Sequence, residues 1–182
     1  EFESLMKNMK NKPLIFGIIQ GGSNLGLRKK CAEELIRLNF DGYAFGGFPI
    51  DENKKFLSGI LEHTASLMPK DKPKYAMGVG KPNDIKECVK YGYNMFDCVL
   101  PTRDARHQRL YVKKEKSYKF MYIGSSKYKT DTKPISKNCK CEACQKYSRA
   151  YLYNLFKNND SLGGRLATIH NLQFYNDFVS DL

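Results

Sequence analysis

Long hydrophobic runs are missing from this 182-residue chain, since no stretch approaches the roughly 18 consecutive apolar residues that a membrane span needs. The first residues, Glu-Phe-Glu-Ser-Leu, lack the basic and apolar segments of a signal peptide as well as an initiating Met. Ordinary shares of hydrophobic residues (41%) and aromatic residues (13%) exclude a disordered chain. We therefore expect a globular, cytoplasmic protein without membrane contacts, cut from a longer sequence.

Acidic residues are scarce relative to basic ones. The chain has 31 Lys and Arg against 19 Asp and Glu, a net charge of +12 that favours a polyanionic partner. Residues 103–149 contain fourteen basic and only four acidic residues. Aromatic residues are interleaved with them: Tyr111, Tyr118, Phe120, Tyr122 and Tyr128. Phosphate-neutralising charge mixed with stacking rings is typical of nucleic-acid binding, with a solvated lysine-rich hairpin as the alternative.

Only six cysteines occur, and they do not form the paired pattern of a disulfide framework. Three are scattered along apolar or helical segments. The other three cluster and are followed by a histidine in a helical pattern: Cys139, Cys141, Cys144 and His170. Thiolates and a neutral imidazole are ligands that Zn²⁺ prefers, and four of them close a tetrahedron with no open position for substrate. We predict a structural zinc site in preference to redox chemistry or a disulfide. A knuckle-like turn would bring Cys139 and Cys141 to the same metal ion.

Four short apolar runs predict buried strands at residues 14–19, 42–45, 75–79 and 95–100. Helical patterns follow the first three, over residues 24–38, 56–61 and 84–91, after glycine-containing loops. Such repeats imply parallel strands with right-handed crossovers. The fold class is therefore α/β, either an open doubly wound sheet or a TIM (β/α)8 barrel, of which four units form half.

Beyond the fourth strand the pattern changes. Period-two stretches at residues 109–113 and 118–123 predict a small β-rich insertion, and helices are expected over residues 144–156 and 162–182. His170 lies on the last helix, so the metal would join the insertion to it. We therefore divide the chain into half of a barrel (residues 1–101), a basic insertion with the zinc-binding cysteines (residues 102–161) and a closing helix (residues 162–182).

The predicted strand ends carry unusual residues for a core: Gln20, Gly46–Gly47, Met77–Gly78 and Asp97. The carboxyl ends of barrel strands carry the chemistry. Asp97 falls in an apolar run, where an unpaired carboxylate would cost several kcal/mol. It is either a structural carboxylate with hydrogen-bond partners or a nucleophile that attacks the anomeric carbon of a sugar and expels its base. The amide of Gln20 can donate and accept at the edge of a purine.

Five motifs, in this order, resemble the C-terminal half of the tRNA-guanine transglycosylase (queuine tRNA-ribosyltransferase) family. They are GIIQGG at 17–22, GYAFGG at 42–47, MGVG at 77–80, MFDCVLPTR at 95–103 with Arg106, and the C-x-C-x₂-C-x₂₅-H pattern. The resemblance runs from about Pro13 to the end. It implies a TIM barrel with a zinc-binding subdomain. It also implies exchange of the wobble guanine of GUN-anticodon tRNAs for a 7-deazaguanine base, queuine or its precursor, through a covalent intermediate on Asp97.

The same resemblance implies roles for further residues of this chain. Those that would hold the base are Gln20, Gly46, Gly47 and Met77. Those that fall where the family contacts RNA are Gly78, Val79, Gly80, Lys81, Pro82, Asn83, Asp84, Thr102, Arg103, Asp104, Ala105 and Arg106. Family members act as dimers with the zinc region near the interface, so a homodimer or heterodimer is expected.

Two departures from the family pattern matter. Residues 48–52 read Phe-Pro-Ile-Asp-Glu where the family has a small, glycine-containing loop ending in Glu. Pro49 has no N–H to offer a base, so the identity of the accepted base stays open. The family's N-terminal half, with its acidic general acid/base residue and a further base-binding Asp, is also missing. The chain alone is therefore expected to be inactive.

Three rival hypotheses remain. A non-catalytic, RNA-binding subunit of a heterodimeric transglycosylase would keep the fold and the zinc site, although the intact Asp97 and the Pro-Thr-Arg segment after it argue against this. A zinc-stabilised RNA-binding module would bind RNA without forming a covalent adduct. An enzyme acting on DNA would show no requirement for the 2′-hydroxyl.

Overall fold

The computed structural model of the chain describes residues 12–115 and 117–182. The N-terminal segment of the expected barrel half, residues 1–11, and Lys116 of the basic segment lie outside the described residues. The chain divides into two compact units, with the boundary between Asp97 and Cys98, and each is described by itself. Across the described residues, every helix is too short or too polar to cross a membrane.

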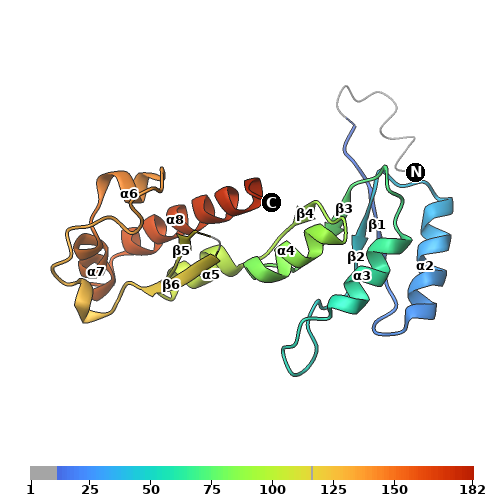
Figure 1. The fold of residues 1–182 in the computed structure, drawn as a ribbon, viewed down its shortest axis with the longest axis horizontal. Coiled ribbons are helices and arrows are strands. Elements are labelled where there is room, and N and C mark those ends of the chain that lie inside the picture. Colours follow the sequence, from blue (N-terminus) through green and yellow to red (C-terminus); the bar gives the residue numbers. More distant parts are fainter. Residues whose placement is uncertain (1–11, 116) are drawn as a thin grey trace. The chain divides into compact units, whose positions relative to one another are not determined.

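The first unit contains a parallel sheet with the strand order β1-β2-β3-β4 (Figure 1). The strands are β1 (Phe16–Ile19), β2 (Gly42–Phe45), β3 (Lys74–Ala76) and β4 (Met95–Phe96), and the intervening helices are α2 (Leu25–Arg37), α3 (Ser58–Leu67) and α4 (Pro82–Lys90). The predicted α/β class with four parallel strands is confirmed. Helix α2 begins where expected, because the side chain of Asn24 accepts a hydrogen bond from Leu27 N at 3.0 Å.

One face of this sheet is covered by helices and the other is not. Helix α3 contacts both α2 and α4, so the three helices form one layer. Ile19, Phe45 and Ala76 share a row of the sheet and are fully buried. The adjacent row points to the opposite face, where Ile18 and Met95 are each 41% exposed. Ala44, in the middle of that row, is buried, so the second face is apolar and only partly covered by the described residues.

The fourth strand is shorter than predicted. Only Met95 and Phe96 pair with β3, and helix α5 (Leu100–Arg106) begins in the segment that the sequence suggested was strand. Pro101 therefore lies in the first turn of a helix, where its missing N–H costs nothing, instead of closing a strand. Similarly, β3 ends at Ala76. The predicted strand extensions to residues 79 and 100 are wrong.

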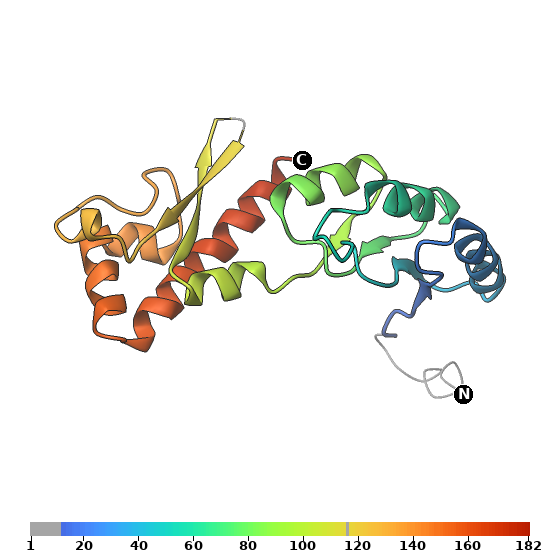
Figure 2. The same cartoon turned by 90° about the horizontal axis from the view of Figure 1, so that it is seen from below.

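The second unit combines a hairpin with five helical segments. Strands β5 (Arg109–Lys114) and β6 (Ser117–Tyr122) pair antiparallel, as the period-two pattern predicted. The helical segments are α5, η1 (Ser126–Tyr128), α6 (Glu142–Lys146), α7 (Arg149–Lys157) and α8 (Ser161–Ser180). Helix α8 contacts α5, α6, α7 and β5 and is the central support of the unit (Figure 2).

The helix expected over residues 144–156 is two helices, α6 and α7. Ser148 begins α7 and accepts a hydrogen bond from Tyr151 N at 3.1 Å. The next two backbone amides, of Arg149 and Ala150, donate to the carbonyls of Lys133 and Asp131 at 2.8 Å each. Because an unbroken helix would use these amides internally, the contacts with the 131–133 loop end one helix and start the next.

Candidate functional site

The predicted strand-end residues lie along one edge of the first unit's sheet. The last residues of the four strands pair in register, Ile19 with Phe45, Phe45 with Ala76 and Ala76 with Phe96. The residues that follow them are Gln20, Gly46, Met77 and Asp97. Because the strands are parallel, these four positions continue a single row at the carboxyl edge of the sheet. The structure thus places all the strand-end candidates at the same edge.

Gln20 and Gly46 are in close contact within this row. A Cβ built on Gly46 would lie 2.6 Å from both Cδ and Nε2 of Gln20, closer than real side chains allow. The Gln20 side chain therefore occupies the space that any other residue at position 46 would need. Gln20 and Gly47 are exposed, whereas Gly46 is buried and Met77 half-buried. The exposed side-chain amide of Gln20 therefore lies beside the exposed backbone at Gly47.

Asp97 is exposed, so the argument from a carboxylate buried in a strand is wrong. The carboxylate follows β4 and its Oδ1 accepts a hydrogen bond from Gly78 N at 2.9 Å. Gly78 has a φ of +74°, a conformation that residues with side chains rarely adopt. Burial raises the pKa of Tyr75, and so does the neighbouring Asp97 carboxylate. Asp97 is therefore oriented by the Gly78 amide and still open to solvent.

Arg28 is a residue that the sequence reasoning missed. It lies on α2 and is 2% exposed. Its guanidinium donates to the carbonyls of Ile19 at 3.2 Å, Gly22 at 2.7 Å and Gly46 at 3.1 Å. The available signal was helical spacing, because Arg28 and the buried Ala32 are four residues apart and therefore share the face of α2 that meets the sheet.

The segment that departs from the family pattern forms a closed loop after β2. Phe48 is 86% exposed. The carbonyl of Pro49 accepts from Leu57 N at 2.9 Å, and Ile50 pairs with Phe56. The Asp51 carboxylate accepts from Lys55 N at 2.8 Å. The loop is therefore held by its own hydrogen bonds, with an exposed aromatic ring next to Gly47.

The residues expected to contact RNA differ in exposure. In the first unit, Gly78, Lys81 and Asn83 are exposed and Asp84 is half-buried, whereas Val79, Gly80 and Pro82 are buried. In the second unit, Arg103 and Arg106 are exposed and Thr102 is half-buried, whereas Asp104 and Ala105 are buried. The buried residues support the backbone, and only the others present side chains or backbone to a ligand.

The basic segment is more tightly paired than its composition suggested. Four of its cations form ion pairs, joining Arg109 to Asp104, Lys113 to Asp181, Lys146 to Glu142 and Arg149 to Asp131. Two of the aromatic residues expected to stack on bases, Tyr111 and Tyr128, are buried, whereas Phe120 and Tyr122 are exposed. The accessible stacking surface is therefore smaller than predicted.

Asp104 and Asn171 anchor α5 inside the second unit. Asp104 accepts hydrogen bonds from the side chains of Arg109 and Tyr111. Asn171 is fully buried on α8, donates to the carbonyls of Pro101 and Arg109 at 3.0 Å each and accepts from Tyr111 N at 3.1 Å. These bonds join α8, α5 and β5, the elements around the expected metal ligands.

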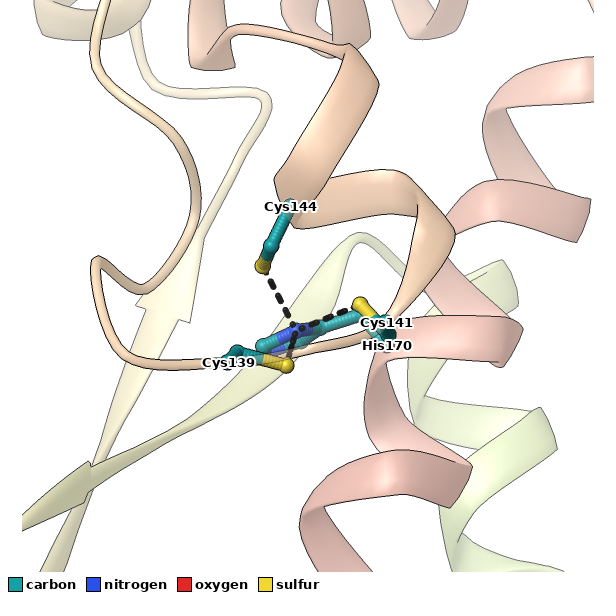
Figure 3. Close-up of side chains that lie close together, drawn as sticks. All are labelled: Cys139, Cys141, Cys144 and His170. Carbon is teal, nitrogen blue, oxygen red and sulfur yellow. Dashed lines mark hydrogen bonds between the residues drawn. The ribbon is translucent and has the colours of Figure 1, made fainter.

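The four predicted metal ligands meet at one point (Figure 3). Nδ1 of His170 lies 3.6 Å from Sγ of Cys139, 3.7 Å from Sγ of Cys141 and 3.3 Å from Sγ of Cys144. All four donor atoms lie within 4.8 Å of one another, and all four residues are buried. Such a Cys₃His group could hold a metal ion.

Local structure prepares these donors. The backbone turns between Ser136 and Cys139, and Cys141 is the residue before α6, so these two of the three cysteines come from short bends. Nε2 of His170 donates to the carbonyl of Tyr111 at 2.8 Å, which fixes the tautomer and leaves Nδ1 as the ligand. Hydrogen bonds among the three thiols lower the pKa of Cys141 and raise that of Cys144, so the cysteines titrate as one coupled group.

The sequence was compared with known families and curated proteins. A sequence model of the family described as Queuine tRNA-ribosyltransferase matches residues 2–182. A queuine tRNA-ribosyltransferase of Idiomarina loihiensis is 47% identical over 179 residues, covering 98% of this chain and 47% of that protein. One of Mannheimia succiniciproducens is 48% identical over 172 residues, covering 94% of this chain and 44% of that protein. The chain spans about half the length of the curated relatives it matches, and it belongs to the queuine tRNA-ribosyltransferase family.

Proposed function

We propose that the protein to which this chain belongs is a tRNA-guanine transglycosylase that exchanges the wobble guanine of GUN-anticodon tRNAs for a 7-deazaguanine base. The observation that carries the proposal is the row of Gln20, Gly46, Met77 and Asp97 at one sheet edge. A flat base and the sugar that carries it need base-recognising groups and a nucleophile along one surface, and this row supplies both kinds of group.

Asp97 is the proposed nucleophile. One carboxylate oxygen forms a bond to C1′ of the ribose as the bond between C1′ and N9 of guanine breaks, and the departing base takes up a proton. The incoming base reverses these changes: its N9 bonds to C1′, loses a proton and releases Asp97. Because Gly78 N donates to Oδ1, the carboxylate is held in one orientation. The general acid is not assigned to any residue of this chain.

Base recognition is assigned to the other residues of the row. The amide of Gln20 is exposed and can donate to and accept from a purine-like edge. Gly46 and Gly47 let the base approach the backbone, and the half-buried Met77 provides an apolar contact. Pro49 cannot donate from its backbone and its carbonyl is taken by Leu57, so this loop has fewer free polar groups near the base than its length suggests.

Binding of the tRNA is assigned to the exposed members of the two predicted segments and to the half-buried Thr102. Gly78, Lys81 and Asn83 of the first unit, and Thr102, Arg103 and Arg106 of the second, offer cations and hydrogen-bond donors to phosphate and base edges. Val79, Gly80, Pro82, Asp104 and Ala105 act by supporting these segments. The half-buried carboxylate of Asp84 lies in the first turn of α4, where it helps to hold the segment.

The metal is proposed to be a structural Zn²⁺. With Zn–S bonds of about 2.3 Å and a Zn–N bond of about 2.0–2.1 Å, a tetrahedral ion separates nitrogen from sulfur by about 3.6 Å. The observed separations of Nδ1 from the three sulfurs are 3.3, 3.6 and 3.7 Å. Four protein donors leave no position for substrate, so the ion would hold the fold of the second unit and take no part in base exchange.

The sheet is proposed to be one half of a TIM barrel. Sequential strand order and helices in one layer are expected of a barrel wall, whereas a doubly wound sheet reverses its order and carries helices on both faces. The partly covered apolar face with Ile18 and Met95 supports this interpretation, because parallel sheets are buried on both sides. The missing strands would come from the part of the relatives that this chain does not span. We propose that the whole protein acts as a dimer.

The test is base exchange by the full-length protein. It would be incubated with radiolabelled guanine and a tRNA carrying a GUN anticodon, with the same tRNA carrying adenine at the wobble position as the control. Label is expected in the first tRNA and not in the second. Tight tRNA binding without label in either would contradict the proposal and favour a non-catalytic RNA-binding subunit.

A further inference from the structure

The buried guanidinium of Arg28 joins the two strand ends that carry the proposed base-binding residues. Its three acceptors are the carbonyl oxygens of Ile19, Gly22 and Gly46. The first two lie on either side of Gln20 in the sequence. One side chain on α2 therefore holds the turn after β1 and the end of β2. None of the three acceptors is a side chain, so Arg28 acts on the course of the backbone.

This arrangement is costly for a cation. Burial lowers the pKa of Arg28 below its usual value, and none of the ion pairs among the described residues includes it. Its charge is compensated by carbonyl oxygens and by the ring of Phe45, whose centroid lies 4.5 Å from Cζ. An apolar side chain would fill the space without desolvating a charge. What the guanidinium adds is a rigid fork that fixes several carbonyls relative to one another.

The geometry fixed in this way is that of the base subsite. The carbonyl of Ile19 accepts from Gly46 N at 3.0 Å as well as from Arg28, and Gln20 N lies 3.4 Å from Sγ of Cys31. The Gln20 side chain lies against the α-carbon of Gly46. Arg28 thus contacts the backbone next to Gln20 and the backbone at Gly46. These contacts set the distance between the Gln20 amide and the open backbone after β2.

We propose that Arg28 is a positioning residue for the purine-type base. It sets the separation of Gln20 from Gly46 and Gly47, while the nucleophile and the tRNA-binding segments are held by other contacts. The proposal rests on the proposed function, because it assigns the base to this edge of the sheet. It predicts a defect in the use of free base that is separate from any defect in tRNA binding.

The experiment uses the full-length protein with the variants Arg28→Met, Arg28→Lys and, as a matched control, Arg37→Met at the exposed end of the same helix. The KM for free guanine at saturating tRNA, the KM for tRNA and kcat would be measured with thermal unfolding of each variant. Because misplacement by about 1 Å can cost on the order of 10²-fold, Arg28→Met is expected to raise the KM for guanine by that order. Arg28→Lys should have a smaller effect, and Arg37→Met none.

A KM for guanine that stays at the wild-type value in both Arg28 variants, with only the melting temperature lowered, would show a purely structural role and overturn the proposal. If Arg28→Met fails to fold, Arg28→Lys decides in the same way. If the wild-type protein exchanges no base, the proposed function fails. Calorimetric titration with guanine then tests Arg28 separately: weakened binding in the variants supports the proposal, and equal binding overturns it.

Discussion

Gln20 and Gly46 show how little space the proposed base subsite leaves for variation at a single residue. The two residues come from different strands, and the α-carbon of one abuts the amide of the other. The Gln20 side chain can therefore adopt its observed position only when residue 46 is glycine. The same region contains Arg28, whose hydrogen bonds reach the backbone on either side of this contact.

Gly46→Ala is expected to displace the Gln20 amide, because the new methyl group would lie 2.6 Å from its Cδ. In the full-length protein, we predict a rise in the KM for guanine of about tenfold or more, on the scale of one or two lost hydrogen bonds. Gly59→Ala on α3 is the control, since nothing lies within 4 Å of its added methyl group. That change should leave the KM unaltered and stabilise the helix by up to about 1 kcal/mol. An unaltered KM in Gly46→Ala would mean that Gln20 does not bind the base.

At the scale of elements, α8 holds the second unit together through two adjacent residues with different partners. His170 points Nδ1 at the three sulfurs, and Asn171 hydrogen-bonds the start of α5 and strand β5. The candidate metal ligands and the helix with the proposed RNA-binding arginines therefore share one support. These two functions of α8 can be separated by mutation.

Asn171→Leu is expected to leave Pro101 O, Arg109 O and Tyr111 N without their side-chain partner inside the protein. At about 1 kcal/mol or more for each buried unsatisfied group, the free energy of unfolding should fall by about 3 kcal/mol. Zinc content should stay at the wild-type level, because His170 is untouched. The reciprocal change at the next residue, Leu172→Asn, is the control. Leu172 is 45% exposed, so a change within about 0.5 kcal/mol is expected. Chemical denaturation and metal analysis would measure the free energy of unfolding and the zinc content of both variants. An Asn171→Leu protein as stable as the wild type would contradict the prediction.

How much of these elements could be predicted depends on where their determinants lie. The start of α2 at Asn24 and the cysteine–histidine cluster were predictable, because local sequence carries the signal. The break between α6 and α7 was not, since it depends on carbonyls of the 131–133 loop. The end of β4 at Phe96 was misjudged because an apolar run continues into α5.

The partners of Arg28 and Asp104 could not be predicted for a related reason. A charged residue in a helix is usually solvated, and only the folded structure shows three carbonyls around Arg28 and two donors on Asp104. Asp97 was correctly placed at a strand end but for a mistaken reason, since it is exposed and needs no compensation for burial.

At the scale of the whole molecule, the two units differ in what they need to fold. The second unit has its own hydrophobic core, including Leu110, Ile123, Ile135, Leu152 and Leu166, next to the cysteines. The first unit instead leaves one apolar face of its sheet only partly covered by described residues. The second unit is therefore the part of the chain that a metal could stabilise independently.

A fragment of residues 98–182 is expected to fold in the presence of Zn²⁺ and to lose its tertiary structure when the ion is chelated. Structural zinc contributes about 10–16 kcal/mol in small zinc modules, which exceeds the stability of most domains of this size. Near-ultraviolet circular dichroism and zinc analysis would follow the transition, with a His170→Ala fragment as the control that cannot complete the site. A fragment with the same spectrum with and without zinc would show that the ion is not needed for the fold.

The proposed attack of Asp97 on the ribose is tested most directly by a search for the covalent intermediate. Full-length protein, wild type and Asp97→Asn, would be incubated with a GUN-anticodon tRNA and 9-deazaguanine and separated on a denaturing gel. If Asp97 is the nucleophile, the wild type gives a protein–tRNA band of reduced mobility and Asp97→Asn gives none, with tRNA binding retained in both. A covalent band of equal intensity in Asp97→Asn, or none in a wild-type protein that binds the tRNA, would contradict it.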